Sequence, residues 1–135
     1  MQIKTLDGFV QNWSLTGHYA HAMIESKSSL HLAARDLLRH NFPTLQILEE
    51  VPVPIRKSEI LYLDFFIPML KLAIETHGEQ HYKFVAHYHN NKLGFIKSQK
   101  RDREKQEWCD TNNIKYIALP YNETTDLWLE RINHA

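Results

Sequence analysis

Two short apolar runs separated by only three residues constrain the fold of this chain most strongly. The segments 61–67 (LYLDFFI) and 71–76 (KLAIET) have the composition of strands, and Pro68, Met69 and Leu70 lie between them. A connection this short joins neighbouring antiparallel strands. We therefore predict a β-hairpin centred between Met69 and Leu70, and this centre determines which residues of the two strands lie opposite each other.

The predicted hairpin brings two acidic side chains together. Its centre places Asp64 directly opposite Glu75, and alternation along the strands places His77 on the same face. The other face carries Leu61, Leu63, Phe65, Ile67, Leu72, Ile74 and Thr76. Two carboxylates about 5 Å apart repel each other by about 3 kcal/mol at an effective dielectric near 20. A divalent cation would turn that repulsion into binding, so the pair favours a magnesium site. A different register would leave both acids merely solvated.

The other segments predict an α/β domain. A helix begins at Ser28 or Ser29 and ends near Asn41, and a strand over 45–53 ends at Pro52 and Pro54. The two hairpin strands, a loop over 79–94 and a polar helix over 95–112 follow. A strand over 115–119 and a helix capped by Thr124 or Thr125 complete the order α-β-β-β-α-β-α. Residues 1–27 form an N-terminal extension with a short strand over 9–13, and residues 28–135 form the domain.

Composition limits the classes of protein that fit. The 135 residues are 43% hydrophobic, which is enough for one self-sufficient core, and no apolar run is long enough to span a membrane. No secretory signal is visible at the start, and the single cysteine, Cys109, excludes an internal disulfide. We expect a protein of a reducing, cytoplasmic compartment without a membrane partner.

Charge is balanced over the whole chain but not along it. The sequence has 16 basic and 16 acidic side chains, yet the segment 83–105 holds seven basic and only two acidic ones. A local basic stretch can bind phosphate even in a neutral protein. An ordinary solvated helix face is the alternative explanation of this stretch. The candidate nucleic-acid contacts are Lys83, Tyr88, Lys92, Lys97, Lys100 and Arg101.

The hairpin and the residues after it resemble a superfamily of nucleases. The resemblance lies in Leu63-Asp64-Phe65, Ala73-Ile74-Glu75-Thr76-His77-Gly78, Gln80-His81 and Lys100-Arg101-Asp102-Arg103. These segments are similar to PD-(D/E)XK nucleases, most of all to the very-short-patch repair endonucleases and the EDxHD homing endonucleases. The resemblance covers about residues 28–132. It implies a restriction-endonuclease-like αβββαβ(α) core with a mixed central sheet flanked by helices.

The resemblance also implies roles for the residues of the motif. Asp64, Glu75 and the backbone carbonyl of Thr76 would bind Mg²⁺, with Mn²⁺ as an alternative metal. His77 would hold a metal-bound water, and His81 would act in acid–base chemistry. Asp102 would orient His81, since a carboxylate beside a histidine fixes its tautomer.

The chain departs from the family's pattern at several positions. His77 stands at the lysine position of the wider superfamily, as in the repair branch, and Leu63 stands where a proline is usual. The interval from Gly78 to His81 is one residue shorter than in that branch. Many relatives carry a glutamate on the first helix, and the nearest position here is His31, or Glu25 if that helix begins earlier.

These features predict a metal-dependent DNA endonuclease that nicks DNA or cuts mismatched or branched DNA. Its specificity would come from a partner protein, a homodimer or short loops, and such an enzyme would suit a phage or a mobile element. The chain also resembles RAP domains, through Leu72-Ala73-Ile74-Glu75 and through Gly78 with His81. A non-catalytic RNA- or DNA-binding module is therefore the alternative.

A zinc site is the third reading of the histidines. His77, His81, His87 and His89 have ligand-like spacing, but a fourth soft ligand is missing unless Cys109 folds in. We therefore expect no zinc. His87 and His89 are expected to be exposed, whereas Trp108 and Cys109 are expected in the core. Cys109 is not expected to be a nucleophile, because no motif links a base to it.

Overall fold

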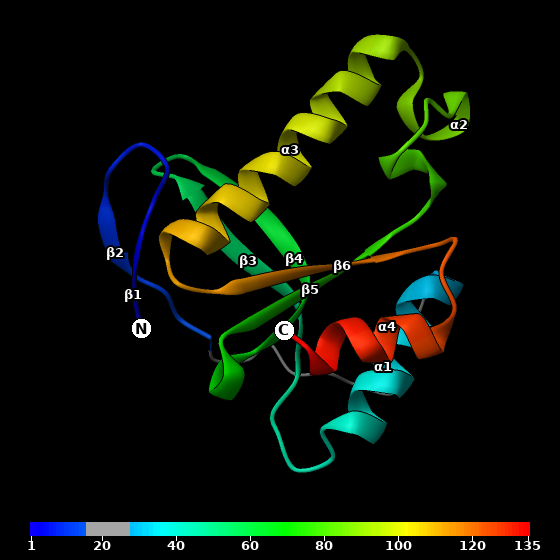
Figure 1. Cartoon of the computed structure of the whole chain (residues 1–135). Helices are drawn as coiled ribbons and strands as arrows, with labels where there is room; N and C mark the ends of the chain where they lie inside the picture. The colour runs from blue at the N-terminus through cyan, green and yellow to red at the C-terminus, as the bar shows by residue number, and fades with distance from the viewer. Residues whose placement is uncertain (16–27) are drawn as a thin grey trace.

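The computed structural model describes residues 1–15 and 28–135, apart from the side chains of His87 and Tyr88 (Figure 1). Its strands are β1 (Gln2–Lys4), β2 (Val10–Asn12), β3 (Leu48–Arg56), β4 (Glu59–Ile67), β5 (Leu72–His77) and β6 (Lys115–Pro120). Its α-helices are α1 (Ser29–Asn41), α2 (Ala86–His89), α3 (Lys92–Thr111) and α4 (Thr125–Asn133). Two 3₁₀ turns, η1 (Pro68–Leu70) and η2 (Glu79–His81), flank β5.

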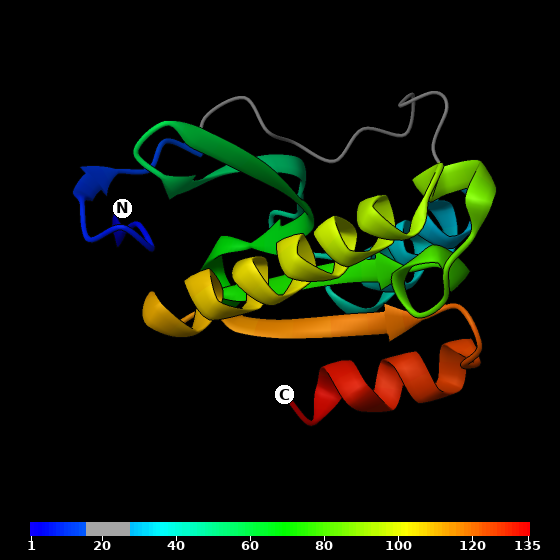
Figure 2. The same cartoon turned by 90° about the horizontal axis from the view of Figure 1, so that it is seen from above.

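From α1 onward the predicted order α-β-β-β-α-β-α is confirmed, with the short helix α2 added before α3. The central sheet has the order β3-β4-β5-β6, and it is mixed because only β5 and β6 run parallel. Helix α3 covers one face of the sheet, and α1 and α4 cover the other (Figure 1). Seen from above, α3 lies obliquely across the strands (Figure 2).

The predicted helix starts are confirmed by their caps. The Ser28 hydroxyl accepts a hydrogen bond from the His31 N–H, and the Thr124 hydroxyl accepts one from the Leu127 N–H. Such caps satisfy donors that the first turn leaves unpaired. Helix α3 starts at Lys92, three residues earlier than predicted, because Asn91 caps it. The expected loop over 79–94 is therefore partly wrong.

The first strand of the sheet lies further along the chain than the sequence predicts. It covers Leu48–Arg56 rather than 45–53, and it continues through Pro52 and Pro54 instead of ending there. Both prolines pair with residues of β4, and β3 is an edge strand. A proline is tolerated on such a strand because the missing N–H can face away from the neighbouring strand.

The register of the β4–β5 hairpin is as predicted. Phe65 pairs with Ile74 and Ile67 pairs with Leu72. The same register places Asp64 opposite Glu75. The hairpin's predicted apolar face is only partly correct. Phe65, Ile67, Leu72 and Ile74 pack toward α1 and α4, whereas Leu61 and Leu63 pack on the α3 side with Phe66.

The change of face has a local cause in the neighbouring strand. Glu50 has a positive φ of 50° and interrupts the pairing between β3 and β4 opposite Asp64. A left-handed residue breaks the regular alternation of side chains, as in a β-bulge. Leu48 and Val51, on either side of Glu50 but three residues apart, consequently share one apolar cluster.

The N-terminal residues pack against the domain. Strands β1 and β2 form a small antiparallel sheet, which includes the strand predicted near 9–13. Trp13 is buried and its indole N–H donates to the Pro52 carbonyl at 2.7 Å. Whether residues 1–27 form a separate extension remains a prediction, and Glu25 lies outside the described residues. Among the helices that the structure describes, none is long and apolar enough to cross a membrane.

Candidate active site

A cleft opens between the start of α1, the β4–β5 hairpin and α3. Asp64, Glu75 and Thr76 line it from the hairpin, and His81 lines it from η2. Lys105 of α3, Glu50 of β3 and residues 28–31 complete its wall. The fold therefore gathers around one cleft four of the six predicted catalytic and metal-binding residues, whereas His77 and Asp102 line a neighbouring hollow.

The two carboxylates of the hairpin are linked through the backbone. The Asp64 N–H donates to Glu75 Oε2 at 3.0 Å. The Asp64 carboxylate in turn accepts hydrogen bonds from the N–H and the hydroxyl of Thr76, at 2.9 and 3.1 Å. These contacts hold the Asp64 side chain in a fixed position at the edge of the cleft.

Glu75 is buried and carries a partner that the sequence analysis missed. The Lys105 ammonium lies 2.8 Å from Glu75 Oε1. Burial, together with the negative charge of Asp64, raises the pKa of Glu75 to about 8, and Lys105 offsets only part of this effect. The available signal was helical spacing, because Lys105 lies three residues after Asp102 and therefore on the same side of α3.

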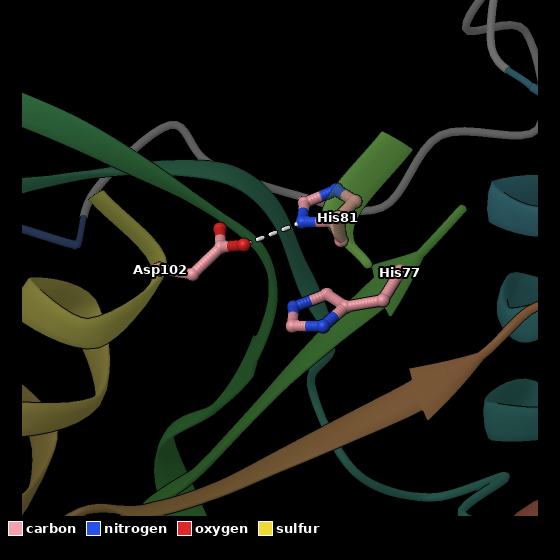
Figure 3. Close-up of side chains that lie close together, drawn as sticks. All are labelled: His77, His81 and Asp102. Atoms are coloured by element: carbon pink, nitrogen blue, oxygen red, sulfur yellow. Dashed lines mark hydrogen bonds and ion pairs between the residues drawn. The ribbon is translucent and has the colours of Figure 1, made fainter. Parts of the chain in front are cut away.

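His81 and Asp102 form the hydrogen-bonded pair that the resemblance implied. His81 Nδ1 donates to Asp102 Oδ2 at 2.7 Å, and the second ring nitrogen of His81 points away from Asp102 (Figure 3). The His77 ring stacks on the His81 ring with centroids 4.2 Å apart and planes within 2°. The carboxylate and the stacked ring together fix the orientation of His81.

His77 is held between two tyrosines. Its Nε2 lies 3.1 Å from the Tyr116 hydroxyl and its Nδ1 lies 3.3 Å from the Tyr82 hydroxyl. Burial, and then the neighbouring His81, lowers the pKa of His77 to about 4, so its ring is neutral at pH 7. With both ring nitrogens engaged, His77 acts here as a support for His81. Holding a water, as the resemblance implied, would require one nitrogen to be released.

Potential metal ligands also meet on the α1 side of the cleft. One ligand atom each from His31, Glu50 and Asp64 lie within 4.8 Å of one another, and His77, His81 and Asp102 form a second such group. Two carboxylates suit Mg²⁺ or Mn²⁺, and an added imidazole favours Mn²⁺ over Mg²⁺ and also suits Zn²⁺. Glu50 was missed because strand alternation alone could not distinguish it from Glu49.

The His31 imidazole of the first group is held in place by a buried carboxylate, that of Glu49. His31 donates from Nε2 to Glu49 Oε1 at 2.5 Å, and Arg35 donates two hydrogen bonds to the same carboxylate, each at 2.9 Å. All three side chains are buried, and the His31 ring stacks on Phe65. This contact fixes the start of α1 against β3 at the rim of the cleft.

The basic candidates are exposed but do not line the cleft. Lys83, Lys92, Lys97, Lys100 and Arg101 are all exposed, and the side chain of Tyr88 lies outside the described part of the chain. At about 100° per residue, Lys97 and Lys100 lie about 140° and 160° around α3 from Asp102. They therefore occupy the opposite side of the helix from the His81–Asp102 pair.

Two further predictions have definite outcomes. Trp108 and Cys109 are fully buried, as expected, and burial raises the pKa of the Cys109 thiol to about 12. His89 was expected to be exposed, and this prediction is wrong. Its ring is buried between the rings of Phe84 and Phe95. Its Nδ1 accepts the Val85 N–H at 2.9 Å, which fixes the short helix α2.

Comparisons with known proteins found relatives of part of the chain. It is 46% identical over 61 residues to uncharacterized protein 307L of Invertebrate iridescent virus 6, and 38% identical over 61 residues to uncharacterized protein 033L of Invertebrate iridescent virus 3. It is 39% identical over 62 residues to uncharacterized protein 094L of Frog virus 3. Each match covers 45% of this chain, but only 31%, 31% and 40% of the respective relatives. No family model and no solved structure matches.

Proposed function

We propose that this chain is a metal-dependent DNA endonuclease of the PD-(D/E)XK type. The observation that carries the proposal is that Asp64, Glu50 and His81 border one cleft, and that Asp102 orients His81 through a hydrogen bond. The two carboxylates can bind a divalent cation, and the histidine can transfer a proton. Phosphodiester hydrolysis requires both functions close together.

The donors in the cleft fit a hard divalent cation. Asp64 and Glu50 offer oxygen ligands, and Glu75 and the Thr76 carbonyl are the further ligands that the resemblance implies. A cation bound there would stabilise the ionised form of Glu75. Burial and the charge of Asp64 disfavour that form in the absence of a cation and so raise the pKa of Glu75. A bound Mg²⁺ supplies Lewis acidity and neutralises charge at the phosphate.

The chain's own residues would manage the protons and the substrate. Asp102 holds the Nδ1 proton of His81, which leaves Nε2 free to accept or donate a proton at the reacting phosphate. The neutral His77 ring supports this orientation without adding a second positive charge. Lys105 places positive charge beside Glu75 and at the wall of the cleft.

The proposal is tested by incubating the protein with supercoiled plasmid and with labelled branched, mismatched and RNA duplexes, in Mg²⁺, Mn²⁺ or EDTA. We expect metal-dependent DNA nicking that Asp64→Asn abolishes. Asp110→Asn, an exposed acid near the end of α3, is the matched control and should remain active.

The alternative, a non-catalytic nucleic-acid-binding module of the RAP type, predicts a different result. Such a module would bind RNA or DNA without cleavage in either metal and would tolerate Asp64→Asn. That outcome would reject the nuclease. The Glu75–Lys105 pair would then have only a structural role.

A further inference from the structure

One side of α3 carries exposed side chains that the cleft does not use. We define the outer face of α3 by Lys92, Leu93, Ile96, Lys97, Lys100 and Arg101. Leu93 and Ile96 are 58% and 57% exposed, which is high for large apolar side chains on a helix that packs on a sheet. The segment 92–101 contains four basic residues and no acidic one. Within the described ranges 1–15 and 28–135, no ion pair is found for these four cations.

Most of the outer face points away from the cleft. At about 100° per residue, Leu93, Ile96 and Lys100 lie about 120°, 180° and 140° around the helix from Lys105, which lines the cleft. Lys97 and Arg101 lie nearer to it, at about 80° and 40°. A rise of 1.5 Å per residue separates Leu93 from Asp102 by about 14 Å along the axis. The amino-terminal half of α3 also projects beyond the sheet together with α2, so this face is open to a large partner (Figure 1).

The chemistry of the outer face matches duplex DNA. Four uncompensated cations attract phosphates, and each phosphate contact releases a bound counterion. Leucine and isoleucine flanked by basic residues resemble the apolar wedges that unstack base pairs at bent or distorted DNA. A membrane surface fits less well, because interfacial helices present a wide apolar face with aromatic anchors, whereas this face has two aliphatic side chains among four cations.

We propose that the outer face of α3 binds a second segment of the DNA, such as one arm of a branched duplex, while another segment occupies the cleft. This inference rests on the proposed function for the identity of the ligand. A straight duplex in the cleft can pass only one side of α3. Contact with both sides therefore requires bent or branched DNA, which specifies the substrate class.

Binding measured in EDTA tests this inference without requiring cleavage. Fluorescence anisotropy would compare a labelled three-way junction with a linear duplex of equal length over a range of salt concentrations. The charge variant is Lys97→Gln/Lys100→Gln, and the apolar variant is Leu93→Ser/Ile96→Ser. The control is Lys4→Gln/Lys71→Gln, since both of these lysines are exposed elsewhere on the chain.

We expect the charge variant to reduce the slope of log K against log salt by about 2 on the junction. The apolar variant should weaken junction binding by at least about tenfold, because each side chain would lose its contact with bases. Both variants should lose much less affinity for the linear duplex than for the junction, and the control should match the unmodified chain on both ligands. All variants should keep the circular dichroism and melting temperature of the unmodified chain, because every substituted side chain is exposed.

Several outcomes would overturn the inference. Unchanged junction binding by both variants would do so, even if the unmodified chain cleaves DNA in Mg²⁺. Equal losses on junction and linear duplex would show a single binding surface. Losses seen only on anionic phosphatidylserine vesicles, or only in self-association, would assign the face to a membrane or to a second copy. Face-dependent junction binding without cleavage would instead reject the nuclease and leave this inference standing.

Discussion

The Lys105 ammonium lies 2.8 Å from Glu75 Oε1, and this contact joins α3 to the central strand β5 at the wall of the cleft. Glu75 is almost completely buried, and Lys105 is only slightly exposed. Breaking a buried pair by removing one partner leaves an uncompensated charge, which costs more than the pair itself contributes. The pair is therefore a sensitive point for both stability and function.

Lys105→Met should lower the free energy of unfolding at pH 8 by about 1 kcal/mol, because about half of the Glu75 carboxyls are ionised there and lose their cation. The pKa of Glu75 is raised to about 8 in the folded chain, so its carboxyl is protonated in the native state well below that pH. The loss should therefore shrink toward pH 5. Adding Glu75→Gln to Lys105→Met should restore most of the stability at pH 8. Urea unfolding at both pH values measures these differences, and an equal loss at pH 5 and pH 8 would contradict the account.

His81→Gln should reduce the rate of DNA cleavage by about 10²–10⁴-fold, because it removes the group proposed to transfer the proton. Asp102→Asn should cost about 10–100-fold, because the histidine then loses the carboxylate that orients it. Single-turnover cleavage of plasmid measures both rates. His134→Gln, an exposed histidine near the carboxyl end, is the control. Full activity of His81→Gln would remove His81 from the mechanism.

The burial of His77 should make stability depend on pH. Its folded pKa, about 4, is below the unfolded value of 6.5, so the unfolded chain binds more protons between these values. Stability should therefore fall as pH decreases from 6.5 to 4, by up to about 3 kcal/mol from this residue. His77→Gln should flatten that part of the profile relative to the unmodified chain. Parallel profiles for the two chains would show that His77 does not titrate in this way.

Trp13→Ala should destabilise the chain by about 3–5 kcal/mol, because the indole is buried against Phe66 and Trp108 and bonded to Pro52. The matched control is Phe9→Ala, since Phe9 is 44% exposed near the same small sheet. It should cost less than 1 kcal/mol, about the usual cost of a surface substitution. Thermal melts compare the two. Equal effects would show that the N-terminal strands are not part of the core.

Much of the fold could be predicted because short-range signals determined it. Three residues between two apolar runs fixed the β4–β5 register, and Ser28 and Thr124 marked the starts of two helices. The prolines of β3 predict the wrong end for this strand, because an edge strand tolerates proline. The apolar side chains of β4 before and after Asp64 pack on opposite faces of the sheet. This change of face depends on the positive φ of Glu50, which no residue pattern predicts.

The candidate site was predictable where a motif carried it, as for Asp64, His81 and Asp102. Lys105 and Glu50 enter the cleft only through the packing of α3 and β3 on the hairpin. The burial of His89 could not be predicted, because the sequence around it is polar and does not show that Phe84 and Phe95 pack against its ring. The basic run was visible in the sequence, but only the helical period shows that Lys97 and Lys100 face away from Asp102 while Lys105 shares its side.

The central claim is that a divalent cation held by Asp64 is required for DNA cleavage. The most direct test is the single-turnover rate of plasmid nicking over a range of Mg²⁺ concentrations, for the unmodified chain and for Asp64→Asn. We predict a rate that rises with Mg²⁺ and saturates in the unmodified chain, vanishes in EDTA, and falls by at least about 10³-fold in Asp64→Asn. Nicking by Asp64→Asn at the unmodified rate, or nicking that persists in EDTA, would contradict the claim.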